Sequence, residues 1–209
     1  MKTIRFKIFI AFLSLGSVFT LQTYGQETIL FSETYSYGEL TGWLDPDDSL
    51  FHLLVTDQSD PGSARLGNCS EQNADRLWSY LNNKTFREQL PDDIWFAWGR
   101  QTDPGHRTLF ALRKSSVTGV PGIDDIRSVS VQKGDAGGSY DLLIKFTGEG
   151  AEKWATLTRE NVGRDIAIVI KGEVVTAPRV MMEIVQGKCR ISGDFSEQEA
   201  SEIKALLGS

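Results

Sequence analysis

Few residues in this sequence have the types and spacing that bond-making chemistry requires. The chain contains two histidines, His52 and His106, and two cysteines, Cys69 and Cys189. None of the four has the spacing of a metal-ligand set. His106 lies in a polar loop with no acid, base or nucleophile motif beside it. The sequence therefore predicts no catalytic residue and no metal site.

Other patterns that resemble catalytic or nucleotide-binding motifs are incomplete. The acidic pairs Asp47-Asp48 and Asp92-Asp93 are typical of solvated turns. The stretch "GEGAEKW" has Gly148 and Gly150 but no third glycine and no Lys-Ser/Thr pair, so it matches neither nucleotide fingerprint. The chain also contains no Gly-x-Ser-x-Gly and no His-Glu-x-x-His motif. We therefore predict a protein that is not an enzyme and binds no cofactor.

The two cysteines have two possible states. In an oxidising compartment Cys69 and Cys189 can form a disulfide, which closes a long loop and contributes about 4–5 kcal/mol in the chain-entropy treatment. The alternative is two separately buried thiols. The sequence does not decide between them, because pairing requires Cα atoms within about 7 Å.

The first 25 residues have the pattern of a secretory signal peptide. Three basic residues precede an apolar run over residues 8–21, and small residues stand before the expected cleavage site between Gly25 and Gln26. Polar and glycine residues interrupt the run, which is shorter than the ~20 apolar residues of a spanning helix. We predict a periplasmic or otherwise exported protein. The alternative is a chain that remains anchored in the membrane at its N-terminus.

Composition and charge exclude several classes of partner. The chain has 209 residues, 40% of them hydrophobic, with 22 Lys and Arg against 28 Asp and Glu and a net charge of −6. Nucleic-acid binding needs clustered bases, which the sequence does not show. No second apolar run approaches membrane length. We expect no nucleic-acid partner and no stable membrane insertion after signal cleavage.

Residues 26–63 have the weakest pattern in the chain. They contain a strand-like run over residues 28–35 and an apolar patch over residues 50–55. Residues 38–49 and 56–64 are rich in turn formers and are predicted to be loops. The fold of this N-terminal segment is left open.

Residues 64–116 predict a helix followed by a β-hairpin. Ser70 is a suitable N-cap for a helix, and a buried stripe follows it at helical spacing, consisting of Ala74, Leu77, Trp78 and Leu81. This spacing predicts that Trp78 is a core residue. Residues 92–99 and 107–114 alternate between apolar and polar types, which is typical of two paired antiparallel strands.

Residues 117–209 have the clearest pattern. The expected elements are strands over 126–132 and 140–146, a helix capped by Thr147, a strand over 165–170, a turn at Lys171-Gly172, a strand over 173–177 that ends at Pro178, a short strand over 189–192, and a helix capped by Ser196 and Glu199. We predict an α+β fold with a mainly antiparallel sheet and helices packed on one face. Two sub-modules, residues 64–116 and 117–209, are expected to meet near Val117.

The second module resembles a known family. The run "LLIKFTGEGAEKWATLTRENVGRDIAIVIKGEVVTAPRV" and the following "GKCRISGDFSEQEASEIKALL" are similar to the head subdomain of the first periplasmic domain of SecD and SecDF, accessory subunits of the Sec protein-export machinery. The resemblance is weak from Ala64 and specific after Val117. It implies a periplasmic module that engages unfolded polypeptides. Family members commonly carry an acidic residue where Lys171 stands, so no role of that turn is carried over.

Taken with that resemblance, the sequence predicts an exported binding module whose partners are polypeptides, Sec translocon components or envelope proteins. The expected modes are pairing at a strand edge or an apolar groove beside Pro178, formed by Val175, Val180 and Met182. A competing interpretation makes these apolar side chains ordinary core residues. The alternative function is a SecD-head-like domain reused as a structural or interaction subunit of the cell envelope with no export role.

Overall fold

A computed structural model describes residues 29–56, 59–102, 104–114, 119–134 and 138–208. The predicted signal peptide, its cleavage site at Gly25 and Gln26, and Val117 lie outside these residues. Within them, no helix is both long enough and apolar enough to cross a lipid bilayer.

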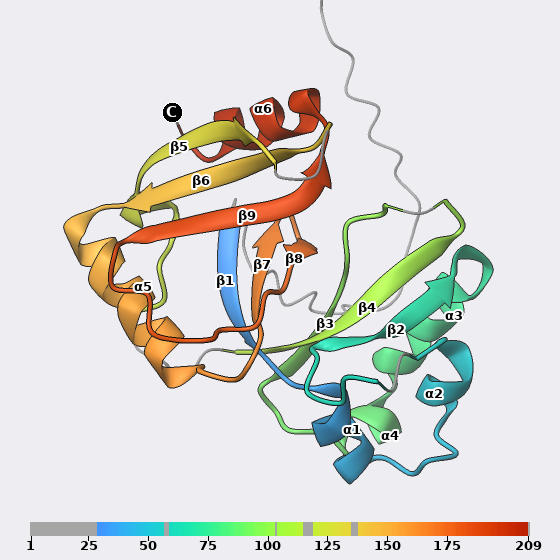
Figure 1. The fold of residues 1–209 in the computed structure, drawn as a ribbon. Coiled ribbons are helices and arrows are strands. Elements are labelled where there is room, and N and C mark those ends of the chain that lie inside the picture. The colour runs from blue at the N-terminus through green and yellow to red at the C-terminus, as the bar shows by residue number, and fades with distance from the viewer. Residues whose placement is uncertain (1–28, 57–58, 103, 115–118, 135–137, 209) are drawn as a thin grey trace, which may run out of the picture.

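The described residues form two antiparallel sheets and several helices (Figure 1). The six-stranded sheet consists of β1 (Ile29–Thr34), β2 (Arg65–Ser70), β3 (Ile94–Trp98), β4 (His106–Arg113), β7 (Ile166–Ile170) and β8 (Glu173–Thr176). The three-stranded sheet consists of β5 (Ile126–Lys133), β6 (Tyr140–Phe146) and β9 (Lys188–Phe195). The α-helices are α1 (Tyr37–Trp43), α2 (Ser49–Leu53), α3 (Glu71–Leu81), α4 (Lys84–Arg87), α5 (Gly148–Glu160) and α6 (Glu197–Leu206). The predicted α+β class with mainly antiparallel sheet is confirmed.

Strand β1 is the centre of the six-stranded sheet. It pairs with β7 along its length, with Phe31 opposite Ile168, and with the end of β4, where Thr34 lies opposite Leu112. The strand order is β2-β4-β1-β7-β8, with β3 on the other edge of β4. Strand pairing therefore crosses the expected boundary near residue 117, and the division into two sub-modules stays a prediction.

The six-stranded sheet curls until its two ends meet. Gly99, directly after β3, forms a parallel bridge with Val174 of β8, and the Arg100 amide donates to the Val174 carbonyl at 2.9 Å. A Cβ at position 99 would stand 2.8 Å from the Phe110 ring, so this close approach requires glycine. The interior of the curl is filled by small and medium apolar side chains, namely Ala97, Leu112, Ala167, Val169 and Val174.

A second apolar cluster fills the space between the two sheets. Phe31 of β1 is fully buried there, with its ring centroid 5.6 Å from that of Phe146 and 5.2 Å from that of Trp154. Helices α5 and α6 contribute Trp154, Leu157 and Ala200 to the same cluster. Because side chains alternate along a strand, β1 sends Phe31 into this cluster while Leu30 packs against the interior of the curl.

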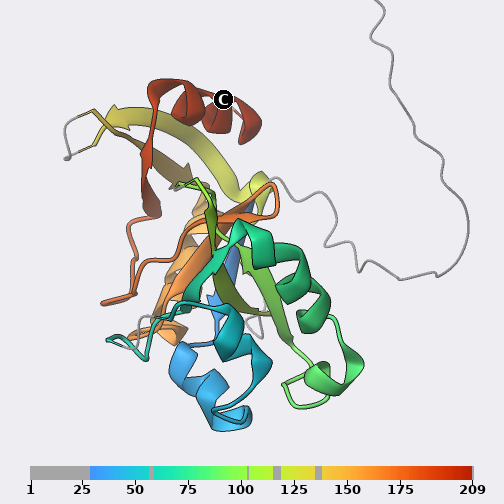
Figure 2. The ribbon, with the colours of Figure 1, turned by 90° about the vertical axis from the view of Figure 1, so that its right-hand side faces the viewer.

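The third cluster lies under helices α1–α4, which pack against the β2, β3 and β4 region (Figure 2). The prediction that residues 38–49 are loop was wrong, because most of α1 and the start of α2 form there. Helix α1 begins with a capping box in which the Ser36 hydroxyl accepts from the Glu39 amide and the Glu39 carboxylate accepts from the Ser36 amide. Strand β2 was also missed; its register shifts between Arg65 and Gly67.

The prediction that Trp78 is a core residue was wrong. Ala74, Leu77 and Leu81 of the same stripe are buried, but Trp78 is 39% exposed. Its ring lies against Trp98, with centroids 5.8 Å apart, so the indole covers the edge of the cluster from outside.

The local signals of the second half are confirmed. Thr147 caps α5 by accepting from the Gly150 amide, and every residue of β7 is buried. Lys171 and Gly172 have φ of 52° and 84°, the left-handed pair that a tight hairpin turn requires. Strand β8 ends at Thr176 before Pro178, and Ser196 with Glu199 forms the predicted capping box of α6. Strand β9 is longer than the predicted 189–192.

Both cysteines are free, buried thiols in different apolar clusters. Cys69 lies on β2 under the helices, and Cys189 lies on β9 between the sheets. Burial raises the pKa of the Cys189 thiol to about 12 and also raises the pKa of Cys69. The structure therefore does not form the disulfide considered from the sequence, and the raised pKa of each buried thiol opposes formation of the reactive thiolate.

Replacing Phe31 by alanine should test the central position of β1. The substitution removes a fully buried ring from the space between the sheets, so we expect the free energy of unfolding to fall by about 3–5 kcal/mol in urea titration. Val162→Ala, at a largely exposed site, should change it by less than about 0.5 kcal/mol. Equal effects from the two variants would contradict the packing described here.

The state of the cysteines gives a second test. In the folded protein, a thiol-specific chromogenic reagent should label neither Cys69 nor Cys189 at mildly alkaline pH, and denaturation should expose both thiols. Electrophoretic mobility should be the same with and without reductant. A mobility shift on reduction, or a denatured protein without free thiols, would show that the two residues pair.

Candidate binding surface

Residues 177–187, which join β8 to β9, form a linker that is not part of a helix or strand but is fixed at several points. The Gly163 amide donates to the Val180 carbonyl and the Val180 amide to the Arg164 carbonyl, both at 2.8 Å. Further along, the Ile184 amide donates to the Thr158 hydroxyl at 2.9 Å. These bonds hold the linker along the C-terminal end of α5 and the turn after it.

A buried acidic residue fixes the start of the linker. The Asp165 side chain accepts from the Arg179 Nε and from the Ala64 amide, both at 2.8 Å. The Asp165 carbonyl also accepts from the Thr34 hydroxyl of β1 at 2.7 Å. Arg179 pairs with Asp60 on its exposed side at 3.0 Å. The linker is thereby tied to the central strand and to the N-terminal half.

The four predicted binding residues do not share one surface. Val180 is 6% exposed and packs in the cluster between the sheets, whereas Met182 is 70% exposed. Pro178 is exposed, and Val175 is half-buried against the same cluster as Val180. The structure thus separates a core residue, Val180, from an exposed one, Met182.

Three largely exposed apolar side chains lie close together in sequence in the second part of the linker. Met181, Met182 and Val185 are 78%, 70% and 68% exposed. Clustered large apolar residues on a surface mark interaction sites, and unbranched methionine adapts to differently shaped partners. We call Met181, Met182 and Val185 the apolar patch. Met181 and Val185 were missed from the sequence; the signal present there was the apolar-rich run over residues 180–185 that follows Pro178.

Val175 lines a separate hollow of about 170 Å³ between the β7–β8 hairpin and α6. Its apolar lining is Ile170, Val175, Phe195, Ile203 and Leu206, and its charged lining is Arg100, Lys171, Glu173, Glu199 and Glu202. The hollow has room for an apolar side chain, with ionic groups around it.

Arg100 fixes one wall of this hollow. Its guanidinium lies 4.6 Å from the Phe195 ring centroid and pairs with the Glu199 carboxylate at 2.9 Å, and it donates to the Gly193 carbonyl. Hydrogen bonds from Ser196, together with the Arg100 charge, lower the pKa of Glu199. Arg100 therefore joins the end of β3 to β9 and α6, a role that its sequence context did not reveal.

The apolar patch and the hollow beside Val175 are surfaces to which another molecule can bind. In the described ranges, no three His, Cys, Asp or Glu residues come together as a possible metal site. His52 lies in α2, and His106 pairs with Ser70 where β4 meets β2. The apolar patch and the hollow beside Val175 offer apolar and ionic contacts instead.

Comparison with known proteins gives consistent similarities. Residues 99–209 match the family described as the SecDF P1 head subdomain. The protein translocase subunit SecD of Acidaminococcus fermentans is 43% identical over 75 residues, which are 36% of this chain and 18% of that protein. The protein translocase subunit SecDF of Thermus thermophilus is also 43% identical over 75 residues, 36% of this chain and 10% of that protein. The chain thus spans less than a fifth of the length of these relatives.

A solved structure described as "Structure and function of a membrane component SecDF that enhances protein export" aligns with 95% of this chain and 71% of that chain. The two are 23% identical, with a TM-score of 0.45.

The anchor of the linker can be tested with two substitutions, one at each acidic partner of Arg179. Asp165→Ala leaves the buried Ala64 amide without its acceptor and removes the buried partner of Arg179, so we expect a loss of about 2–3 kcal/mol in the free energy of unfolding. Asp60→Ala removes only the exposed partner of Arg179 and should cost at most about 1 kcal/mol. Urea titration of both variants measures the difference. Similar small losses in both would mean that Asp165 does not fix the linker.

Proposed function

The chain belongs to the SecDF P1 head subdomain family, and from this membership we propose that it is a periplasmic or otherwise exported, non-enzymatic module that engages polypeptides during protein export. The relatives named above are protein translocase subunits, and one related structure is described as a component that enhances protein export. We extend the polypeptide-handling part of that role to this chain. Sec translocon components or other envelope proteins are its proposed partners.

The observation that carries the proposal is the apolar patch. Met181, Met182 and Val185 expose large apolar side chains on a linker whose backbone is hydrogen-bonded to α5 and to the turn after it. Displaying these side chains to water is unfavourable, and covering them with an apolar segment of another chain removes that cost. Three flexible or small side chains also accept many different sequences, which suits a partner that is still unfolded.

The hollow beside Val175 and a free strand edge supply further contacts. The hollow has an apolar lining that can receive one side chain of an extended segment. Among the strands that the structure describes, β5 is an outer strand of the three-stranded sheet and pairs with β6 alone, so its other edge can accept a strand from a partner.

The proposal can be tested by placing a photo-crosslinking amino acid at Met182 in cells that export the protein. We expect crosslinks to polypeptides in transit, and we expect them to disappear when export is blocked. The same amino acid at Glu88, an exposed residue that caps the C-terminal end of α4 and is far from the linker in the sequence, serves as control and should yield none of these adducts. Crosslinks from position 182 only to resident envelope proteins, unchanged when export is blocked, would instead support reuse of the domain as an envelope subunit.

Purified protein allows a quantitative form of this test. Met181→Ser with Met182→Ser should weaken binding to a permanently unfolded, reduced and alkylated protein about tenfold, because two exposed apolar contacts are lost. Val55→Ser is the matched control, since Val55 is 74% exposed but lies in the N-terminal half. If the two variants bind the unfolded protein with the same affinity, the apolar patch does not take part in the proposed binding.

A further inference from the structure

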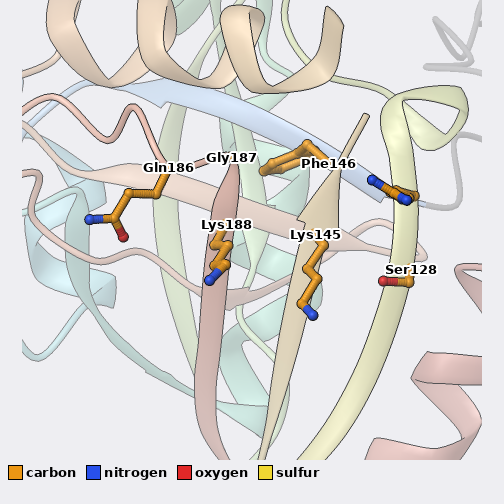
Figure 3. Close-up of a pocket in the computed structure, with 7 residues that line it drawn as sticks. Ser128, Lys145, Phe146, Gln186, Gly187 and Lys188 are labelled. Carbon is orange, nitrogen blue, oxygen red and sulfur yellow. The ribbon is translucent and has the colours of Figure 1, made fainter. Parts of the chain in front are cut away.

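A second hollow lies at one end of the three-stranded sheet and is lined by basic side chains (Figure 3). Its volume is about 430 Å³, and its walls come from the start of β5, the end of β6 and the start of β9. We call it the basic hollow. Its lining residues are Arg127, Ser128, Lys145, Phe146, Gln186, Gly187 and Lys188.

Strand register sets two lysines side by side in this hollow. Lys145 of β6 lies directly opposite Lys188 of β9, and Ser128 of β5 lies opposite Lys145 on the other side. Figure 3 shows the Lys145 and Lys188 side chains projecting from neighbouring strands in the same direction. Like charges directly opposite each other destabilise a strand pair, so this arrangement has a cost in the unliganded protein.

A β-bulge adds the third cation. The β5–β6 register shifts from Ile126 opposite Phe146 to Ser128 opposite Lys145, which leaves Arg127 as the extra residue. Bulges re-aim side chains, and here the bulged residue lines the same hollow as the two lysines.

The cations of the basic hollow differ from other bases of the same sheet. Within the part of the chain that the structure describes, Arg127, Lys145 and Lys188 form no ion pair. Farther along β9, Arg190 is paired with Asp141 at 2.7 Å. The chain as a whole carries a net charge of −6, so acids are plentiful elsewhere. Three cations line one hollow, and the described residues form no ion pair with them. This arrangement favours an anionic occupant.

We propose that the basic hollow is a subsite for Asp and Glu side chains of a bound polypeptide, next to the apolar patch. This inference rests on the proposed function and names the substrate class: polypeptide segments in which acidic residues stand beside apolar ones. Gln186 of the hollow directly follows Val185 of the patch in the chain, so one extended segment reaches both. Carboxylates match the lysine ammonium groups and the Arg127 guanidinium.

A polypeptide fits the observations better than an anionic membrane does. The net negative charge of the chain opposes approach to a surface of anionic lipid, whereas a flexible segment brings its carboxylates to the hollow alone. The hollow is open to solvent, so its contacts are individually weak and sensitive to salt. These properties suit a substrate that must be released.

The test compares two fluorescent peptides with the same leucine- and alanine-based apolar stretch, one flanked by glutamates and the other by glutamines. Fluorescence anisotropy with the full protein should show about tenfold tighter binding of the glutamate peptide, from several exposed ionic contacts. The preference should disappear between about 0.1 M and about 1 M salt, as the screening length falls from about 10 Å to about 3 Å.

The deciding variant is Lys145→Gln with Lys188→Gln. It should remove the preference for glutamate and leave the affinity for the glutamine peptide unchanged. Its stability to urea should be unchanged or higher, because the two opposed charges are gone. Lys84→Gln with Lys204→Gln removes the same number of charges from helices α4 and α6 and should keep the full preference.

Each other outcome is distinguishable. Equal binding of both peptides that still depends on Met181 and Met182 would overturn the acidic subsite and keep the proposed function. No binding of either peptide would overturn both proposals. If the variant instead loses binding to phosphatidylglycerol vesicles, or loses self-association in sedimentation, without any difference between the peptides, the occupant is a membrane or a second copy and the acidic-polypeptide subsite is overturned.

Discussion

The structure depends on the double pairing of β1. Strands from the two halves of the sequence, β4 and β7, bond to this one strand, so neither half completes the six-stranded sheet without it. Its alternating side chains also enter two different clusters: Phe31 packs between the sheets and Leu30 against the curl. A strand with both faces covered and both edges paired has little freedom to shift, since a slip of one residue would exchange its two faces. The relative positions of the remaining elements follow from that.

The surface linker takes its rigidity from the same strand. The Thr34 hydroxyl of β1 donates a hydrogen bond to the Asp165 carbonyl, and the Asp165 carboxylate accepts one from Arg179. These two hydrogen bonds connect the start of the linker to the central strand of the sheet. Beyond that point, the Thr158 hydroxyl holds Ile184. The backbone is thus held on both sides of Met181 and Met182, at Val180 and at Ile184. Holding the backbone in advance reduces the entropy lost on binding, which partly offsets the small area that such a patch offers.

The sequence predicted the elements whose signals are local and missed those that depend on distant partners. Helix α6 and the Lys171-Gly172 turn were predicted correctly because capping and turn residues act over a few positions. Strand β2 was missed because its partner, β4, comes much later in the chain and its register shifts at Gly67. Val180 and Met182 were grouped because both stand close to Pro178 in the sequence, but closeness in the sequence does not determine which side chains of a linker are buried. Lys145 and Lys188 become neighbours through the register of β6 and β9, and this register could not be predicted from the composition.

The two kinds of contact on this surface have complementary physical roles. In the proposed function, apolar burial at Met181 and Met182 is non-directional and is not screened by salt, so it would give affinity for many sequences without choosing among them. Exposed lysines contribute little affinity, but their field acts over about 10 Å and favours approach by acidic segments, which the rest of this acidic chain repels. A deep, closely fitting pocket would bind more tightly and would select one sequence. The shallow contacts of two kinds that we propose would instead allow many polypeptides to be held and released, which is the behaviour that transport of unfolded chains requires.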